Sequence, residues 1–125
     1  MPHFALTLAG MIGAATAIIH GMLTQRLIVR PVRRALAEQA GVSASIRRLA
    51  PMLIHYSTFG WLVCGAALMI AANITDAEAR PAISLLAASQ FAYAAVGNFW
   101  GTRGRHPGWM LMAAAVALII FDALG

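Results

Sequence analysis

Charged residues are scarce in this chain of 125 residues, and their scarcity excludes an ordinary water-soluble domain. Only 10% of the residues are charged, 61% are hydrophobic, and lysine is absent altogether. A soluble domain is typically about 25% charged, because charge keeps its outer surface in water. The remaining class is an integral membrane protein, provided that the hydrophobic residues lie in runs long enough to cross a bilayer.

Other absences restrict the chemistry. No carboxylate lies in the middle of an apolar run, which argues against a proton-coupled transporter. The sequence has no Ser/His/Asp arrangement, phosphate-binding loop or HExxH zinc motif. The single cysteine, Cys64, has no partner for an intrachain disulfide. We therefore expect a protein that is not an enzyme.

Hydrophobic residues fall in four long runs, at positions 3–24, 51–72, 81–100 and 107–124. At a rise of about 1.5 Å per residue, each run approaches or exceeds the roughly 30 Å of hydrocarbon in a bilayer. Runs of this length without alternation fit helices rather than barrel strands. The sequence predicts an all-α fold, an integral membrane up-down four-helix bundle that forms a single domain over residues 1–125.

Three prolines support this division of the chain. Pro51, Pro81 and Pro107 each stand at the start of a run. The first position of a helix tolerates proline, because its backbone N–H would have no partner within the helix. The pattern predicts that three of the four helices begin at these residues.

The nine basic residues are all arginines, and they are sorted between the connections. Six lie in residues 25–50 and two in residues 101–106, whereas the connection at 73–80 carries only Arg80. Positive residues in short loops mark the cytoplasmic side of a membrane. We expect both arginine-rich connections inside and both termini outside, in a multi-pass protein of the bacterial inner (cytoplasmic) membrane. This sorting, rather than the net charge of +5, argues against a nucleic-acid partner.

The connection at 25–50 is predicted to be an amphipathic segment at the cytoplasmic interface, with an irregular loop as the alternative. Pro31 is suited to open a short helix with Val32 and Leu36 on one face, Gly41 to end it, and Ser43 to cap the next helix. Its arginines are expected to bind anionic lipid headgroups. They are Arg26, Arg30, Arg33, Arg34, Arg47 and Arg48.

Small residues recur at four-residue spacing within two of the runs. One stripe passes through Gly13, and the other passes through Gly97 and Gly101. In lipid, such stripes let helix backbones approach closely. We expect these glycines to pack helices within the bundle, with self-association as the alternative.

Three histidines are predicted to converge in the cytoplasmic half of the bundle: His20, His55 and His106. A polar side chain at membrane depth needs a partner or a function. One reading is structural, with His20 and His55 hydrogen-bonded across helices, for example to Asn98. A second is a transition-metal site formed by all three imidazoles.

A third reading is a haem site. Two histidines on different helices at equal depth supply both axial ligands of a b-type haem, which here would be His20 and His55. Arg103 and Arg105 would then contact the haem propionates at the interface. The cofactor is thus unknown from the sequence, with haem b as a candidate whose presence is left open.

Three segments together resemble a known group of proteins: "IIHGMLTQRLIVRPV", "RRLAPMLIHYSTFGW" and "GTRGRHPGW". They are similar to an uncharacterised family of small four-helix bacterial inner-membrane proteins. That family has a histidine after helix one, a histidine at the start of helix two and an RGRH turn before helix four. The resemblance implies that a shared role involves His20, His55, Arg103, Arg105 and His106. The chain departs from it at "LTQR", where a Gly-Glu-Arg type of sequence is expected.

With so little outside the membrane, the chain offers mainly helix surface. We expect a non-catalytic accessory or structural subunit of a larger membrane complex, in contact with membrane lipids and with other membrane protein subunits. The alternative is a b-type cytochrome-like electron carrier with the His20/His55 haem site. A third hypothesis is a homo-oligomeric channel or carrier.

Overall fold

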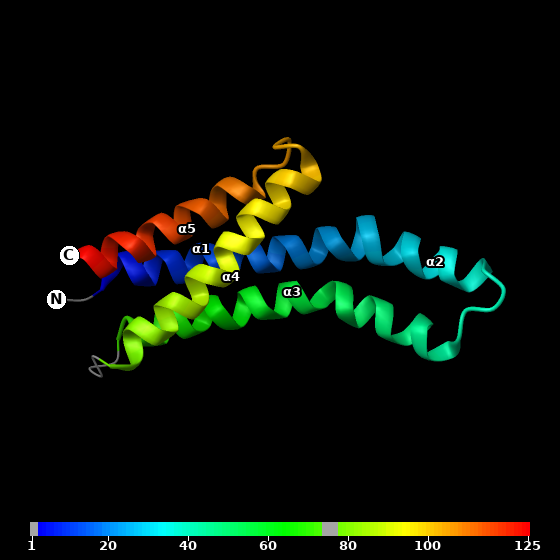
Figure 1. The fold of residues 1–125 in the computed structure, drawn as a ribbon, viewed down its shortest axis with the longest axis horizontal. Coiled ribbons are helices and arrows are strands. Elements are labelled where there is room, and N and C mark those ends of the chain that lie inside the picture. Colours follow the sequence, from blue (N-terminus) through cyan, green and yellow to red (C-terminus); the bar gives the residue numbers. More distant parts are fainter. Residues whose placement is uncertain (1–2, 74–77) are drawn as a thin grey trace.

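The computed structural model describes residues 3–73 and 78–125, and the described chain is helical, as the sequence predicts (Figure 1). In chain order the elements are α1 (Phe4–Thr24), the π-helix η1 (Gln25–Val29), α2 (Arg30–Glu38), α3 (Ala44–Ala71), α4 (Ala79–Thr102) and α5 (Gly108–Leu124).

The first three elements form one continuous helix of 35 residues. The predicted break before Pro31 is therefore wrong. The backbone N–H of Arg30 bonds to the carbonyl of Gln25, five residues back. Pro31 follows directly, and a proline ring crowds the carbonyl four residues before it. The wider π turn makes room for that ring, so the helix passes through the proline instead of starting at it.

The next helix, α3, begins at Ala44, where the side chain of Ser43 accepts a hydrogen bond from the backbone of Ile46 at 3.3 Å. The predicted cap is confirmed. Pro51 lies inside α3, so its expected place at a helix start is wrong. The turn before α3 uses Gly41 at a φ of +87°, a conformation that glycine adopts without strain.

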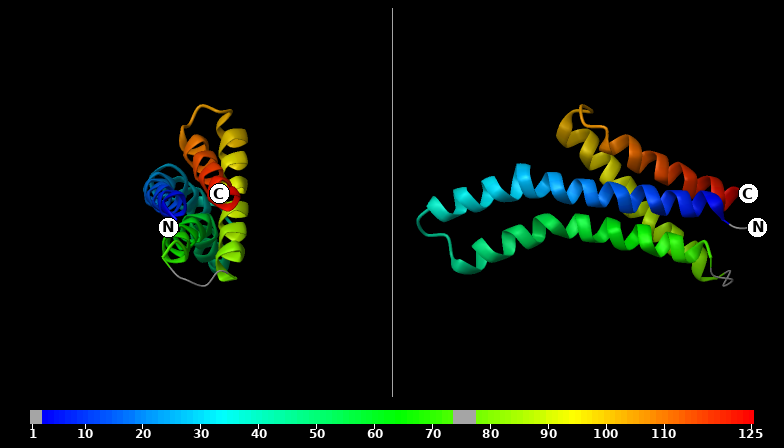
Figure 2. Two further views of the ribbon diagram at one scale, coloured as in Figure 1. Left: turned by 90° about the vertical axis from the view of Figure 1, so that its left-hand side faces the viewer. Right: turned by 180° about the vertical axis from the view of Figure 1, so that it is seen from behind.

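The connection at 25–50 is thus two helix extensions, which pack on each other as a hairpin and not as a separate interfacial segment. We call residues 25–50 the arginine hairpin. Val32 and Leu36 are half-buried on its inner face, as the pattern predicts, and Arg33 and Arg34 are exposed. The hairpin extends well past the turn between α4 and α5 (Figures 1 and 2).

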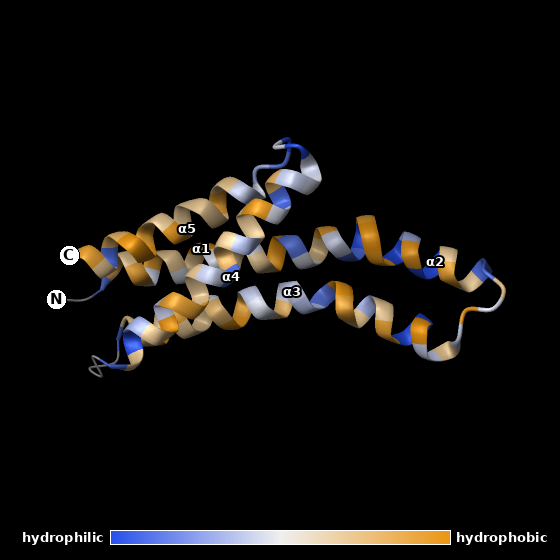
Figure 3. Cartoon of the chain, viewed as in Figure 1, coloured by the Kyte–Doolittle hydropathy of each residue, from blue (hydrophilic) through white to orange (hydrophobic). Residues whose placement is uncertain are grey.

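Within the described residues, three helices are long and apolar enough to cross a membrane: Phe4–Glu38, Ala44–Ala71 and Ala79–Thr102. The fourth, α5, is apolar but has 17 residues. At about 1.5 Å per residue, the first helix is roughly 52 Å long, against about 30 Å of hydrocarbon. Hydrophilic residues gather in the hairpin and in the turn between α4 and α5, and the helix segments between these turns and the chain termini are mostly hydrophobic (Figure 3).

The core lies where α1 packs against α3 and α5, and where α4 packs against α5 and α3. Leu6, Leu68, Phe91 and Met112 are fully buried there. Seen along the helices, α4 stands at one side of the other three (Figure 2, left). Only part of its surface is therefore covered.

Glycines set the spacing of α1 and α3. A Cβ atom on Gly65 would lie 2.7 Å from the carbonyl oxygen of Gly10, so the two backbones are in contact. Gly13 is covered by the ring of Phe91, which reaches it from α4. Such approaches are typical of helix packing in lipid, where the hydrophobic effect does not drive helices together.

The second stripe of small residues, on α4, does not contact another helix in the same way. A Cβ atom on Gly97 or Gly101 would meet nothing within 4 Å, and both residues are exposed. The expectation that they pack helices within the bundle is wrong, because this face of α4 points outward. The alternative stated for this stripe, self-association, or a contact with another molecule, is then the hypothesis that remains.

The difference between the packed Gly65 and the open Gly97 predicts different effects on stability when each glycine is replaced by alanine. Gly65→Ala should destabilise the purified protein by about 1–3 kcal/mol, since the methyl group forces two backbones apart. Gly97→Ala is the matched control, with the same gain in helix propensity and no neighbour to displace. Unfolding in detergent by denaturant titration measures both. Equal stability of the two variants would contradict the packing described for α1 and α3.

Candidate functional site

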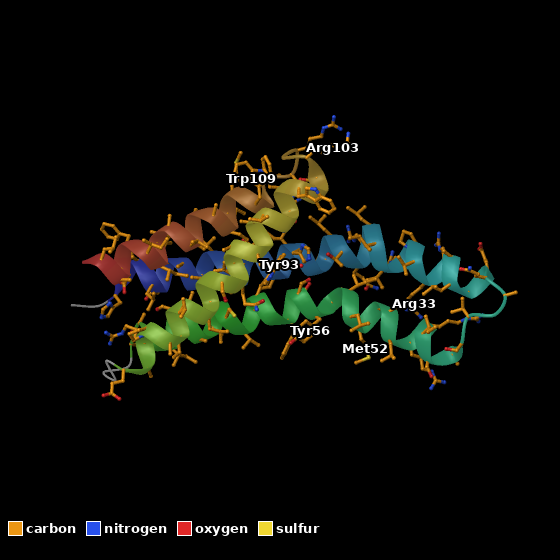
Figure 4. The ribbon with its side chains drawn as sticks, viewed as in Figure 1. Arg33, Met52, Tyr56, Tyr93, Arg103 and Trp109 are labelled. Atoms are coloured by element: carbon orange, nitrogen blue, oxygen red, sulfur yellow. The ribbon has the colours of Figure 1, made fainter. Side chains whose placement is uncertain are left out.

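A groove of about 510 Å³ opens between α3 and α4 at the middle of the apolar segments. We call it the polar groove. Tyr56 and Tyr93, labelled in Figure 4, belong to its two walls. Its hydrogen-bonding side chains are His20, Tyr56, Ser57, Gln90, Tyr93 and Asn98. Three helices thus bring hydroxyl, amide and imidazole groups together at a depth where polar groups are rare.

His20 forms the inner end of the groove. Its ring lies against the indole of Trp61, with ring centroids 4.4 Å apart and an angle of 49° between the planes. Its Nε2 atom and the hydroxyl of Thr24 are hydrogen-bonded at 3.1 Å. The expected bond from His20 to another helix is not formed: its partner, Thr24, is a buried residue one turn further along the same helix.

A second cavity of about 180 Å³ lies on the other side of His20, and Asn98 and His106 also line it. The amide of Asn98 donates to the carbonyl of Ala94 at 2.9 Å, which satisfies it within α4. Nδ1 of His106 accepts a hydrogen bond from the backbone of Gly108 at 3.1 Å. Of the three histidines predicted to converge, His20 and His106 therefore share this cavity, and Asn98 lies beside them.

His55 lies elsewhere, between α3 and the π-helix. Its Nε2 atom donates to Oε1 of Gln25 at 2.9 Å, and this is an interhelical bond of the predicted kind with an unpredicted partner. Gln25 is five residues beyond His20, so His20 and His55 differ in depth by roughly 7 Å. We predicted equal depth because the end of the first span and the start of the second are expected at the same level of the membrane.

This arrangement does not fit the haem reading. Two axial histidines must direct their nitrogens at one iron from opposite faces of the macrocycle. Here the Nε2 atoms of His20 and His55 bond to different partners at different depths, and Trp61 covers one ring. Arg103 points away from the helices at the end of α4, in a turn with a φ of +51° (Figure 4). Arg105 is exposed in the same turn.

The metal reading receives no support from the geometry either. Within residues 3–73 and 78–125, no three His, Cys, Asp or Glu side chains come together as a metal site. His20 and His106 share a cavity, but His55 faces Gln25 outside it. The site predicted from His20, His55 and His106 is therefore not formed in the described part of the chain.

Sequence reasoning missed several residues that shape this region. No motif or spacing in the sequence singles out Tyr93, Gln90 or Trp61. Their shared position on the groove depends on how α4 leans against α3, which a helical period does not reveal. Gln25 was noticed as a departure from the family pattern, and the bond to His55 is the structural use of that amide.

Comparisons with known proteins add no further evidence: no family model, curated protein or solved structure matches this chain. The resemblance of the sequence to a family of small inner-membrane proteins stays a prediction. The features of the chain that bear on function are therefore the polar groove and the exposed helix faces.

The bond between Gln25 and His55 predicts an energetic coupling. Gln25→Met and His55→Phe keep the size of the side chains and remove the polar atoms. A double-mutant cycle on unfolding in detergent should give about 0.5–1.5 kcal/mol of coupling, as for hydrogen bonds between membrane helices. The pair Gln25→Met and Tyr56→Phe is the control, with no coupling expected. Additive effects for Gln25 and His55 would contradict the bond.

Proposed function

We propose that this protein is a non-catalytic accessory subunit of a larger membrane complex, and that it docks through the outward face of α4. One observation carries the proposal. Gln90 and Tyr93 lie in the middle of α4, are exposed, and make no hydrogen bond in the described part of the chain. A polar group that faces hydrocarbon without a partner costs several kcal/mol. A neighbouring transmembrane helix would remove that cost.

The spacing along α4 suits such a neighbour. Gln90, Tyr93, Gly97 and Gly101 lie three, four and four residues apart, which puts them on one helical face. The two glycines leave open space for a second backbone. Small residues beside hydrogen-bonding ones are the usual composition of helix contacts in lipid.

The partner that fits is a transmembrane helix with its own small residues and a serine, threonine or asparagine opposite Gln90. We propose that this helix belongs to a different protein, in keeping with an accessory role in a larger complex. Contact between two copies of this chain is the homo-oligomeric alternative, and a cross-link reports it directly.

A docking experiment tests the proposal. Extraction of the tagged protein from its own membrane in mild detergent should recover a stoichiometric membrane protein. Gly97→Leu should lower that recovery about tenfold, the equivalent of about 1.4 kcal/mol. The control Ala113→Leu makes the same kind of change on an exposed position of α5. Recovery that is unaffected by Gly97→Leu, or a wild-type protein with no partner, would refute docking through α4.

A photo-reactive residue at position 93 identifies the occupant of that face. The expected product joins this chain to the co-purified protein. A product joining two copies would instead support the homo-oligomer.

We further propose that the chain lies in the bacterial inner membrane with the arginine hairpin in the cytoplasm and both termini outside. The support is the sorting of arginines: six in the hairpin and two in the turn before α5, against Arg80 alone at the other end. Membrane lipids are then contacts along the spans and, through the arginines, at the inner surface.

Reporter fusions at the C-terminus test this orientation. Alkaline phosphatase, which needs an oxidising compartment for its disulfides, should be active there, and green fluorescent protein should be dark. A fusion within the turn at residues 39–43 should give the opposite result. Cytoplasmic activity at the C-terminus would invert the proposed topology.

A further inference from the structure

A third hollow, of about 420 Å³, lies at the end of the molecule far from the arginine hairpin. It is formed where the start of α4 meets the end of α5, beside the residue that precedes α1. We call it the terminal pocket. The polar groove and the proposed docking residues of α4 do not take part in it. Its volume is within the about 300–1,000 Å³ that small-molecule sites occupy.

The rim of the terminal pocket carries charges of both signs. Nδ1 of His3 and Oδ2 of Asp122 lie 2.9 Å apart, which joins the beginning of the described chain to the end of α5. The side chain of Asp122 is only 12% exposed. Arg80 stands opposite on α4, where its Nε–H donates to the carbonyl of Ala71 at 3.3 Å.

The walls of the pocket are apolar. Leu85 and Ala88 come from α4, and Ile119 and Ile120 from α5. Leu85 is 74% exposed and Ile120 is 52% exposed, so the pocket is open sideways to the hydrocarbon. The pocket thus has a charged rim at the helix ends and an apolar wall that is open toward the hydrocarbon. This arrangement suits an amphiphilic ligand that lies along the bilayer normal.

We propose that the terminal pocket binds one zwitterionic phospholipid whose headgroup carries a phosphate and a primary ammonium. The phosphate would pair with the Arg80 guanidinium, and the ammonium with the Asp122 carboxylate beside His3. An acyl chain would lie along Leu85 and Ile120. A headgroup with negative charge alone would bring a phosphate near Asp122 without a cation of its own, so the rim selects against it.

The experiment uses the full chain in detergent, exchanged with an equimolar mixture of phosphatidylethanolamine and phosphatidylglycerol that have identical acyl chains. Native mass spectrometry then counts the lipids retained. The expected result is one phosphatidylethanolamine per chain, retained about five-fold over phosphatidylglycerol, as expected for one ion pair of about 1 kcal/mol.

Two rim variants and one control separate the interactions. Asp122→Asn keeps a side-chain partner for His3 and should abolish the preference between the lipids. Arg80→Gln should lower the retention of both lipids several-fold. The control Arg103→Gln removes the same charge at the opposite end and should change neither. Far-UV circular dichroism checks that each variant remains helical.

Equal retention of the two lipids by the wild-type protein would overturn the proposal. A wild-type preference that persists in Asp122→Asn would overturn it as well. Both results are independent of whether α4 docks on another subunit, because the chain is purified alone.

Discussion

The contact of α1 with α3 at Gly10 and Gly65 is the constraint on which the rest of the structure depends. With the two backbones touching, the residues further along face each other in register: Gly21 meets Thr58, and Gln25 meets His55. α1 packs along α3, and α2 contacts α3 again on the far side of the π-helix. In lipid this close packing replaces the hydrophobic driving force that a soluble bundle would have.

The position of α4 follows from that contact. Phe91 covers Gly13 and anchors the middle of α4 on α1, while α5 holds its other side. Beyond Phe91 the helix leaves α3, and the polar groove opens in the space between them. The same turn of the helix that buries Phe91 exposes Tyr93 on the outer face. Gln90, Tyr93 and Gly97 therefore line the groove and at the same time belong to the exposed stripe of α4.

The sequence predicted the helical class, the cap at Ser43 and the inner face of the hairpin, since composition, capping and periodicity depend on local residues. It did not predict that the first helix passes through Pro31, because only the π turn makes the proline compatible with the helix. Together with the place of Pro51 inside α3, this continuation explains why His20 and His55 do not lie at the equal level that was predicted. The orientation of Gly97 and Gly101 was unpredictable for another reason: a four-residue spacing identifies a face but not the neighbour it meets.

The arginine hairpin is so long that its six arginines, all predicted to bind lipid headgroups, cannot all lie at the depth of those headgroups. If the hydrocarbon begins at Phe4, about 30 Å of helix ends near Leu23, and the headgroup layer adds about 5–8 Å on that side. Arg26 falls within this layer, and Arg30, about 10 Å past Leu23, lies just beyond it, where its long side chain still reaches the phosphates. The outer four, Arg33, Arg34, Arg47 and Arg48, project beyond it unless the hairpin tilts toward the surface. They are exposed. The lipid contacts proposed for the hairpin therefore fall on the inner pair, Arg26 and Arg30, and an upright hairpin would hold the outer four in the surrounding water.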